Sequence, residues 1–251
     1  FETMVAAGLA AAGLPVVVVN PAQIRAFAQA IGKRAKTDPI DAAVIAAFTA
    51  ATRPELRPLP DEQTRMLADL VARRRQIVQM IQAERQREKR AAARTRRSIA
   101  RLLKALEREL SSVDREIDEA VRGSPAWREA EDLLASVPGI GKTIARTIIA
   151  ELPEIGSLGR RQVAALVGLA PWTRQSGQWR GRSFIGGGRA TVRSALFVGA
   201  MVAARFNADM KAKLRTLIEA GKVAITAVRR KLVILANALW CDDRLCSPRA
   251  A

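Results

Sequence analysis

The segment Ile99-Ala-Arg-Leu-Leu-Lys-Ala-Leu-Glu-Arg-Glu-Leu-Ser-Ser-Val-Asp-Arg-Glu-Ile117 decides the fold of the middle of the chain. It lies in a longer stretch, Asp61–Val121, that contains neither Pro nor Gly. The apolar periodicity fails near Arg90–Arg97, where we expect the chain to reverse direction. The pattern therefore predicts a coiled-coil helical hairpin over residues 61–123. Its seam would be formed by apolar residues at helical spacing: Met66, Leu70, Ile77, Met80, Ile81, Ile99, Leu102, Leu103, Leu106, Leu110, Val113 and Ile117.

The chain is strongly basic, with a formal net charge of +18. Such an excess favours a polyanionic partner, nucleic acid first, because Lys and Arg displace condensed counterions from phosphates. From Arg73 to Arg101 there are eleven basic and two acidic residues. A solvated helix face is the ordinary explanation of a charge run and fits the mixed charges after residue 106. The earlier excess favours a nucleic-acid-binding surface.

Other classes of protein are disfavoured by composition. An anionic membrane would also attract cations, but no apolar run approaches the roughly 18 residues of a spanning helix, and no signal peptide is visible. The cysteines, Cys241 and Cys246, have neither zinc-site nor disulfide-framework spacing. They fall in a short tail, residues 241–251, and we expect a protein of the reducing cytoplasm without a membrane partner.

The N-terminal part has the pattern of an α/β fragment. Residues 3–13 predict an Ala-rich helix, and Pro15-Val-Val-Val-Val-Asn20 is typical of a buried parallel strand. A second helix is expected over residues 21–31. One strand cannot make a sheet, so we expect further strands upstream of Phe1 in the native protein. Three prolines within residues 53–60 predict a linker that ends this unit.

Two acidic residues follow, in Asp38-Pro-Ile-Asp41. Asp38 suits an N-cap, Pro39 the first helical position, and Asp41 the first turn, so helix capping explains the pair by itself. Alternatively, two carboxylates one turn apart could hold Mg²⁺ against a phosphate. The adjacent cations would then attract a nucleic-acid backbone: Lys33, Arg34 and Lys36.

Beyond the hairpin, residues 124–240 predict a helical C-terminal domain. The segment Leu133–Ile149 resembles a helix-hairpin-helix, in which Gly139, Gly141 and Lys142 would bind phosphate at a helix N-terminus. A tight turn between two core helices is the alternative, and the P-loop spacing is absent. Helices are expected over Arg160–Gly168, Ala190–Phe206, Asn207–Ala220 and Val223–Trp240.

The segment Leu169–Gly188 is too rich in Gly and Arg to be a helix, and it has no acidic residue from Thr173 onward. Ser176 could be a nucleophile toward a phosphodiester, or could simply form a Ser-Gly turn between short strands, which the residues alone favour. The chain has no His and no Tyr, so catalysis must use carboxylates, Ser, Lys, Arg or metal. Phosphate contacts are expected from arginines: Arg174, Arg180, Arg182 and Arg189.

Four motifs together resemble the transposases of the insertion sequence 110 family. In chain order they are Val18-Val-Asn-Pro-Ala-Gln-Ile-Arg-Ala-Phe-Ala28, Ala35-Lys-Thr-Asp-Pro-Ile-Asp-Ala42, Val137-Pro-Gly-Ile-Gly141 and Gly168-Leu-Ala-Pro171 with Gln175-Ser-Gly177 and Arg180-Gly181. The resemblance runs from residue 1 to about 240. It implies a bacterial enzyme that recombines DNA under the guidance of a structured RNA.

The resemblance also implies a fold and a site. The fold would be mainly α, with part of a ribonuclease H-like domain of the DEDD type over residues 1–52, a coiled coil that mediates assembly, and a C-terminal transposase domain. Asp38 and Asp41 would be the last two of four acidic Mg²⁺ ligands, and Ser176 the nucleophile. Phe1-Glu2 resembles the end of a Glu-Ala-Thr-Gly-Gly-Tyr-Glu motif, so Glu2 is not the catalytic Glu. Half of the acidic site would precede the chain, and the chain alone would be inactive.

Two rival hypotheses belong to other classes. One is a non-catalytic nucleic-acid-binding protein, indifferent to Mg²⁺ and to the loss of either aspartate. The other is a basic structural coiled coil that only oligomerises. Family resemblance favours a dimer or tetramer that binds donor and target DNA near the nucleoid.

Overall fold

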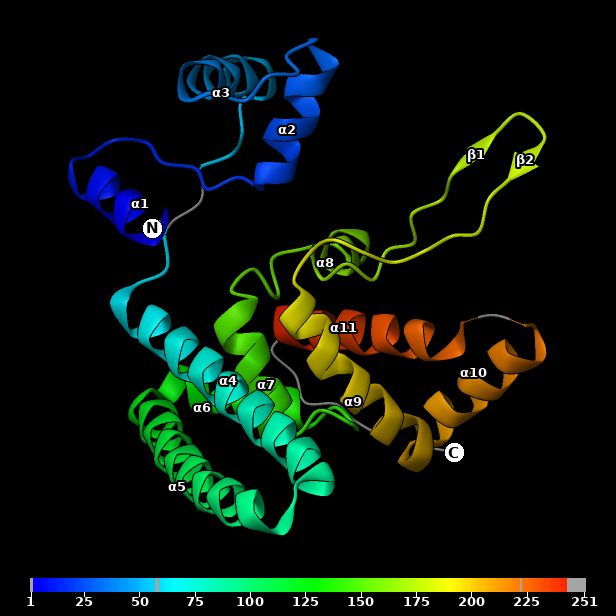
Figure 1. The fold of residues 1–251 in the computed structure, drawn as a ribbon. Coiled ribbons are helices and arrows are strands. Elements are labelled where there is room, and N and C mark those ends of the chain that lie inside the picture. Colours follow the sequence, from blue (N-terminus) through cyan, green and yellow to red (C-terminus); the bar gives the residue numbers. More distant parts are fainter. Residues whose placement is uncertain (1, 57–58, 222, 243–251) are drawn as a thin grey trace. The chain divides into compact units, whose positions relative to one another are not determined.

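A computed structural model describes residues 2–56, 59–221 and 223–242 of the chain (Figure 1). These residues are mainly helical, so the predicted class is confirmed. They divide into two compact units, and the division falls between Asp61 and Glu62. The described elements of the first unit are α1 (Glu2–Ala11), α2 (Pro21–Ala30) and α3 (Asp38–Thr52). Those of the second are α4 (Glu62–Arg90), α5 (Ala93–Gly123), α6 (Pro125–Ala135), α7 (Lys142–Glu151), α8 (Arg160–Leu166), β1 (Gln175–Ser176), β2 (Trp179–Arg180), α9 (Ala190–Phe206), α10 (Ala208–Glu219) and α11 (Ala224–Asp242).

The first unit is built around the packing of α2 on α3. Asn20 caps α2 by accepting a hydrogen bond from the backbone N–H of Ala22 at 2.9 Å, and Pro21 occupies the first helical position. The rings of Phe27 and Phe48 meet edge to face with centroids 5.5 Å apart. Apolar side chains of both helices are thereby removed from water.

The strand predicted for Pro15–Asn20 is wrong. The described part of the first unit contains no strand, and residues 14–20 connect α1 to α2 without regular structure. Val18 is 62% exposed. A strand is stable only when its backbone groups pair with a neighbour, and the described residues offer this segment no partner.

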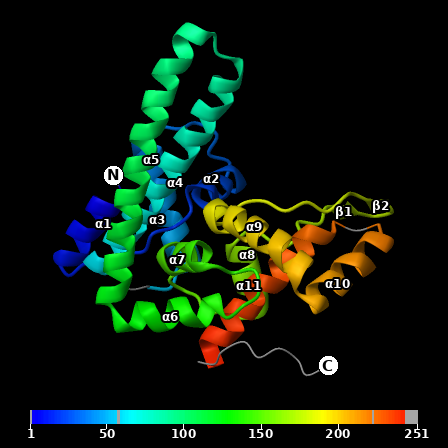
Figure 2. The same ribbon diagram turned by 90° about the horizontal axis from the view of Figure 1, so that it is seen from below.

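The two helices of the hairpin lie where the sequence predicts them. α4 ends at Arg90 and α5 begins at Ala93, so the reversal lies within the expected window, and the two helices run side by side (Figure 2). The predicted seam needs correction, because Met66, Met80 and Leu102 are largely exposed. The buried residues of the two helices are Leu67, Val71, Ile77, Ile81, Leu103, Val113, Ile117 and Val121.

The hairpin shares one hydrophobic core with the helices that follow it. Leu134 of α6, Ile148 of α7, Leu196 of α9 and Leu232 of α11 are fully buried in the same cluster as Ile117 of α5. The helices expected after the hairpin are all present within one or two residues of the predicted bounds. The second unit therefore holds the C-terminal helices and the base of the hairpin as one packed body.

Ion pairs reinforce this shared core. Arg146 of α7 pairs with Asp118 of α5 at 2.6 Å and with Glu131 of α6 at 3.1 Å. Burial lowers the pKa of the Arg146 guanidinium, but the hydrogen bonds and charges of Glu131 and Asp118 outweigh burial and leave the pKa raised. The charged form is thus the stable one between three helices.

Candidate functional site

A protruding β-ribbon carries the candidate nucleophile. β1 and β2 are antiparallel, with Gln175 opposite Arg180 and Ser176 opposite Trp179 (Figure 1). The two-residue turn between them places Gly177 at φ 55°, in the left-handed region that suits Gly at the first central position of a hairpin turn. Ser176 therefore lies beside the tip of the ribbon, at the end of a short strand. This agrees with the Ser-Gly turn between short strands that the sequence offered as an alternative to a nucleophile.

Aromatic residues stiffen the stem of the ribbon. Trp172 and Phe184 form an isolated bridge, with N–H···O distances of 2.7 and 3.2 Å, and their rings stack with centroids 6.4 Å apart. The guanidinium carbon of Arg174 lies 5.3 Å from the Phe184 ring centroid. Trp172 and Trp179 are 58% and 61% exposed. Large exposed rings beside exposed cations are typical of a surface that meets a nucleic acid.

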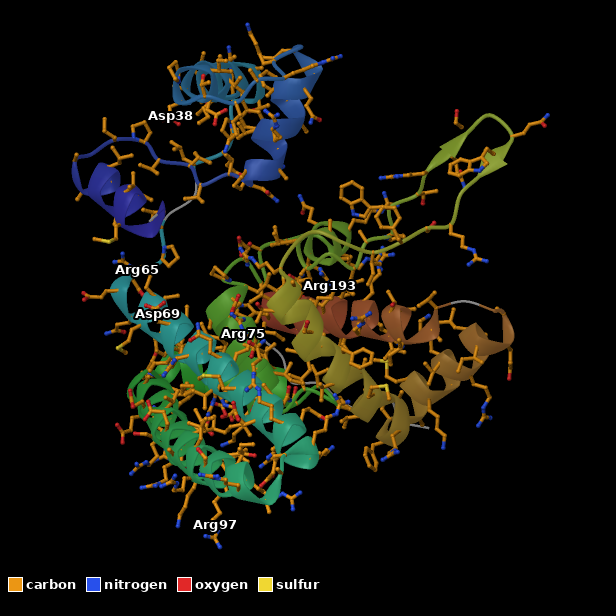
Figure 3. The ribbon with its side chains drawn as sticks, in the orientation of Figure 1. Asp38, Arg65, Asp69, Arg75, Arg97 and Arg193 are labelled. Carbon is orange, nitrogen blue, oxygen red and sulfur yellow. The ribbon has the colours of Figure 1, made fainter. Side chains whose placement is uncertain are left out.

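The base of the ribbon is fixed by close backbone contact. Gly188 lies at φ 58° against the end of α8, and a Cβ there would come within 2.3 Å of the Leu166 carbonyl oxygen. The Arg193 guanidinium donates from Nη1 to the carbonyl oxygens of Val167 at 3.0 Å and Gly187 at 2.5 Å. Figure 3 shows Arg193 at the start of α9. These contacts set where the ribbon leaves the core.

The four predicted arginines have different environments. Arg189 donates to both carboxylate oxygens of Glu154, at 2.5 and 2.6 Å, and is half-buried. Its charge is thus engaged within the protein. Arg174 and Arg182 are exposed on the ribbon. The backbone of Arg180 belongs to β2, but its side chain lies outside the described part of the structure.

Ser176 itself is exposed, and within the described residues its hydroxyl has no hydrogen-bond partner. The neighbouring hydroxyls of Thr173 and Ser183, by contrast, are 3.2 Å apart and hydrogen-bonded to each other. No base lies within the ribbon, because the sequence from Thr173 to Val192 has no acidic residue and the chain has no His. Any group that removes the Ser176 proton must come from elsewhere.

The two aspartates lie in the first turn of α3, in the other unit. Asp38 is exposed at the start of the helix (Figure 3), and Asp41 is half-buried. The N-cap is Thr37, which makes no side-chain cap hydrogen bond, so the prediction of Asp38 as N-cap is wrong by one residue. The backbone N–H of Asp41 donates to the Thr37 carbonyl oxygen at 2.8 Å. Asp38 is therefore free of a capping role.

The surroundings of the aspartates are basic. Lys33, Arg34 and Lys36 are exposed in the connection between α2 and α3. The side chain of Arg25 donates to the Arg34 carbonyl oxygen at 2.9 Å and fixes this connection to α2. Among the described residues, no group of three or more acids or cysteines could hold a metal ion. Asp38 and Asp41 supply two carboxylates, which suits Mg²⁺, since this ion keeps several waters and binds substrate phosphate.

The Val137–Gly141 turn packs against the core. Gly139 has φ 97°, and a Cβ on it would lie 2.4 Å from the Gly199 carbonyl oxygen of α9. The close approach of the turn to α9 therefore requires Gly at position 139. This agrees with the alternative interpretation of the segment as a tight turn between two core helices. Gly141 is the exposed N-cap of α7, and Lys142 Nζ lies 3.7 Å from a Glu131 carboxylate oxygen. The phosphate-binding role of Gly139, Gly141 and Lys142 stays a prediction.

Sequence reasoning missed a cavity of about 510 Å³ between α4, α7 and α9. Its walls are mainly apolar, with Arg74, Arg75 and Arg146 among the lining residues. The Arg75 side chain (Figure 3) donates to Glu151 at 3.0 Å and to Thr191 at 2.6 Å. The cations of this cavity are thus paired within the protein. Arg193 was missed too, because its partners are backbone carbonyls that no side-chain pattern reveals.

Comparisons with known proteins match two parts of the chain to transposase families and 90% of it to gene-inverting proteins. The family model described as transposase IS116/IS110/IS902 matches residues 131–215, and a transposase model for DEDD-type IS110 elements matches residues 1–96. The pilin gene-inverting proteins of Moraxella bovis and Moraxella lacunata are each 30% identical over 236 residues, which is 90% of this chain and 73% of each relative. Among the described residues, no helix is long and apolar enough to cross a membrane. The chain belongs to the IS110 family of transposases, which are DNA recombinases.

Proposed function

We propose that this transposase cuts and rejoins DNA with Ser176 Oγ as its nucleophile. The observation that supports this role is the setting of the hydroxyl, which is exposed beside the tip of a ribbon with no carboxylate from Thr173 to Val192. Because carboxylates would repel a phosphodiester, their absence lets DNA approach. The exposed cations Arg174 and Arg182 on the same ribbon add attraction.

The proposed step is an exchange at phosphorus. A bond forms between Ser176 Oγ and phosphorus while the bond from phosphorus to one deoxyribose oxygen breaks. The departing oxygen keeps the electron pair and takes up a proton, and the serine proton passes to a base outside the ribbon. The phosphoserine link conserves the phosphodiester for rejoining, when a deoxyribose hydroxyl displaces the serine. Arg174 and Arg182 would stabilise the negative charge of the pentavalent phosphate.

Asp38 and Asp41 would hold Mg²⁺ in this proposal. When bound, the ion supplies a Lewis acid that polarises a phosphate oxygen and favours deprotonation of a hydroxyl. The aspartates' own part is to hold and orient this charge, because carboxylate oxygens suit Mg²⁺. Lys33, Arg34 and Lys36 would hold the DNA backbone beside them.

Three further parts of the proposal follow the family resemblance. Residues 1–52 would be part of a ribonuclease H-like domain, residues 61–123 would mediate assembly of a dimer or tetramer as a coiled coil, and residues 124–240 would form the transposase domain. A structured RNA would choose the DNA sequence. The hairpin supports the assembly role, because Met66, Met80 and Leu102 leave apolar surface exposed along it.

The role of Ser176 is tested by trapping covalent protein–DNA species on nicked substrates. We expect Ser176→Ala to reduce the trapped species by at least about 10³-fold, as removal of a nucleophile does, while DNA affinity stays unchanged. Ser183→Ala is the matched control, because Ser183 is another exposed hydroxyl of the same ribbon. Both variants are made in a longer relative with the same Gln-Ser-Gly ribbon, at the positions that match Ser176 and Ser183. Survival of the covalent species in Ser176→Ala would exclude the proposed nucleophile.

The role of the aspartates is tested by Mg²⁺ titration of strand cleavage and by calorimetric binding of Mg²⁺. Asp38→Asn and Asp41→Asn should each weaken Mg²⁺ affinity at least about 10-fold, the loss typical of even an indirect metal partner. Glu55→Gln removes another exposed acid of the same unit and should change neither measurement. Equal Mg²⁺ affinity in all three variants would favour the rival hypothesis of a non-catalytic nucleic-acid-binding protein.

A further inference from the structure

The helix α5 has one buried face and one charged face. Its buried or partly buried apolar residues recur at three- and four-residue intervals and pack in the core of the second unit: Ile99, Leu103, Leu106, Leu110, Val113 and Ile117. At 3.6 residues per turn, these positions define one side of the helix. The residues half a turn away must face solvent.

Six cations occupy this outward side. They follow one another at intervals of three, four, three, four and seven residues, and every one is exposed: Arg94, Arg97, Arg101, Lys104, Arg108 and Arg115. With a rise of about 1.5 Å per residue, the first five span about 21 Å in a nearly straight row. Figure 3 shows Arg97 at the edge of α5 that faces away from α4. We call these six residues the basic stripe.

Most acidic residues of α5 lie on other sides of the helix than the basic stripe. Glu107 pairs with Arg85 at 2.9 Å, Asp114 with Arg74 at 2.6 Å, and Asp118 with Arg146 at 2.6 Å. From Ala93 to Leu106 the helix has no acidic residue at all. Glu119 marks the C-terminal end of the stripe. Within the described residues, none of the six cations takes part in an ion pair.

The stripe has the chemistry of a phosphate-binding surface and lacks that of other interfaces. A protein–protein interface needs an apolar centre, and a membrane-bound helix needs apolar or aromatic residues to insert, whereas the stripe is made of Arg and Lys. Duplex DNA carries one phosphate per roughly 3.4 Å of axis on each strand, so about 21 Å presents about six phosphates per strand. A row of five cations matches such a length.

We propose that the basic stripe of α5 binds the phosphate backbone of duplex DNA without regard to sequence. The straight row lies on a rigid helix whose opposite face is packed in the core, so the cations are held in line before DNA arrives. Phosphate contacts fix the position of a duplex and carry no sequence information directly. The stripe shares no residue with the ribbon or the aspartates, and its role does not depend on the chemistry proposed for Ser176.

The test compares two triple variants of the full chain, each with three cations removed. Arg97→Gln with Arg101→Gln and Lys104→Gln removes half of the stripe. Lys211→Gln with Lys213→Gln and Arg215→Gln removes three exposed cations of α10 and leaves the stripe intact. Binding of a fluorescent duplex DNA is measured by anisotropy at several salt concentrations. Gln is a good helix former, and circular dichroism confirms folding of each variant.

We expect the stripe variant to bind duplex DNA more than about tenfold more weakly near 0.1 M salt. The slope of log affinity against log salt should become shallower by about 2.7, because each lost phosphate contact contributes about 0.9. The α10 variant should stay close to the parent chain, and an Arg97→Lys and Arg101→Lys variant should keep the parent slope. Binding is measured without cleavage, so its outcome does not depend on the role proposed for Ser176.

Two results would overturn the proposal. In the first, the stripe and α10 variants lose equal affinity, which would mean that only net charge matters. In the second, the stripe variant loses affinity for a structured RNA hairpin but keeps its affinity for duplex DNA, which would assign the stripe to RNA.

Discussion

Two half-buried arginines show how the pKa of the same side chain depends on its neighbours. The pKa of Arg146 is raised because two carboxylates surround it, and that of Arg229 is lowered by burial first and by the charge of Arg193 second. The guanidinium carbon of Arg229 lies 5.3 Å from the centroid of the Phe197 ring. Its buried Nε has no hydrogen-bond partner among the described residues. The surroundings of Arg146 therefore favour its charged form, whereas burial and the charge of Arg193 disfavour that of Arg229.

A single glycine sets how closely the Val137–Gly141 turn approaches α9. Gly139→Ala would force a Cβ to within 2.4 Å of the Gly199 carbonyl oxygen at φ 97°. We expect the free energy of unfolding to fall by about 2–4 kcal/mol, from backbone strain and overpacking together. Urea denaturation followed by circular dichroism measures this change.

Gly141→Ala in the same turn is the control for Gly139→Ala. Gly141 has an ordinary φ of −90° and open space where a Cβ would lie. Its replacement should cost less than about 1 kcal/mol, the scale of an N-cap substitution. Similar losses for both alanine variants would show that close packing on α9 is not what demands Gly139.

At the scale of elements, the hairpin was largely predictable and the N-terminal strand was not. Helical propensity and apolar spacing are local properties, so they located α4, α5 and the reversal between them. They did not decide which of two adjacent apolar residues turns inward, and Leu67 is buried where Met66 was expected. A strand depends on a distant partner, so the apolar run of Pro15–Asn20 carried no sufficient information about its own structure.

The number of charged residues along the sequence does not reveal the basic stripe of α5. Residues 107–121 contain six acids and two bases, a mixture that suggested an ordinary solvated face. On the helix they separate by angle, because Glu107 and Asp114 turn toward α4 while Arg108 and Arg115 face solvent. The ribbon is similar in this respect: its turn was predictable from Ser-Gly, but the engagement of Arg189 depends on Glu154, 35 residues away.

At the scale of the molecule, the candidate site is divided between two units. Asp38 and Asp41 belong to the first unit and Ser176 to the second. The motifs identified the residue types and their order, because these are local in sequence. The surroundings of each part depend on contacts between segments far apart in the chain, such as Arg189 with Glu154, so neither spacing nor composition predicts them.

The second unit should unfold as one body, because Arg146 joins the hairpin to the helices after it. The side chains of Arg146 and Glu131 are only 14% and 7% exposed, so Arg146→Met leaves the buried Glu131 carboxylate with the exposed Lys142 ammonium, 3.7 Å away, as its remaining cation. We expect a loss of about 3–5 kcal/mol in a single urea transition, since the hairpin and the C-terminal helices share the core. Arg85→Met breaks the exposed pair with Glu107 and should cost less than about 1 kcal/mol. Two separate transitions in the parent chain's second unit, or equal losses in the two variants, would contradict this role. Replacing Glu131 by Leu in the Arg146→Met variant should restore much of the stability, because the cost arises from a buried charge that has lost its hydrogen-bonded partner.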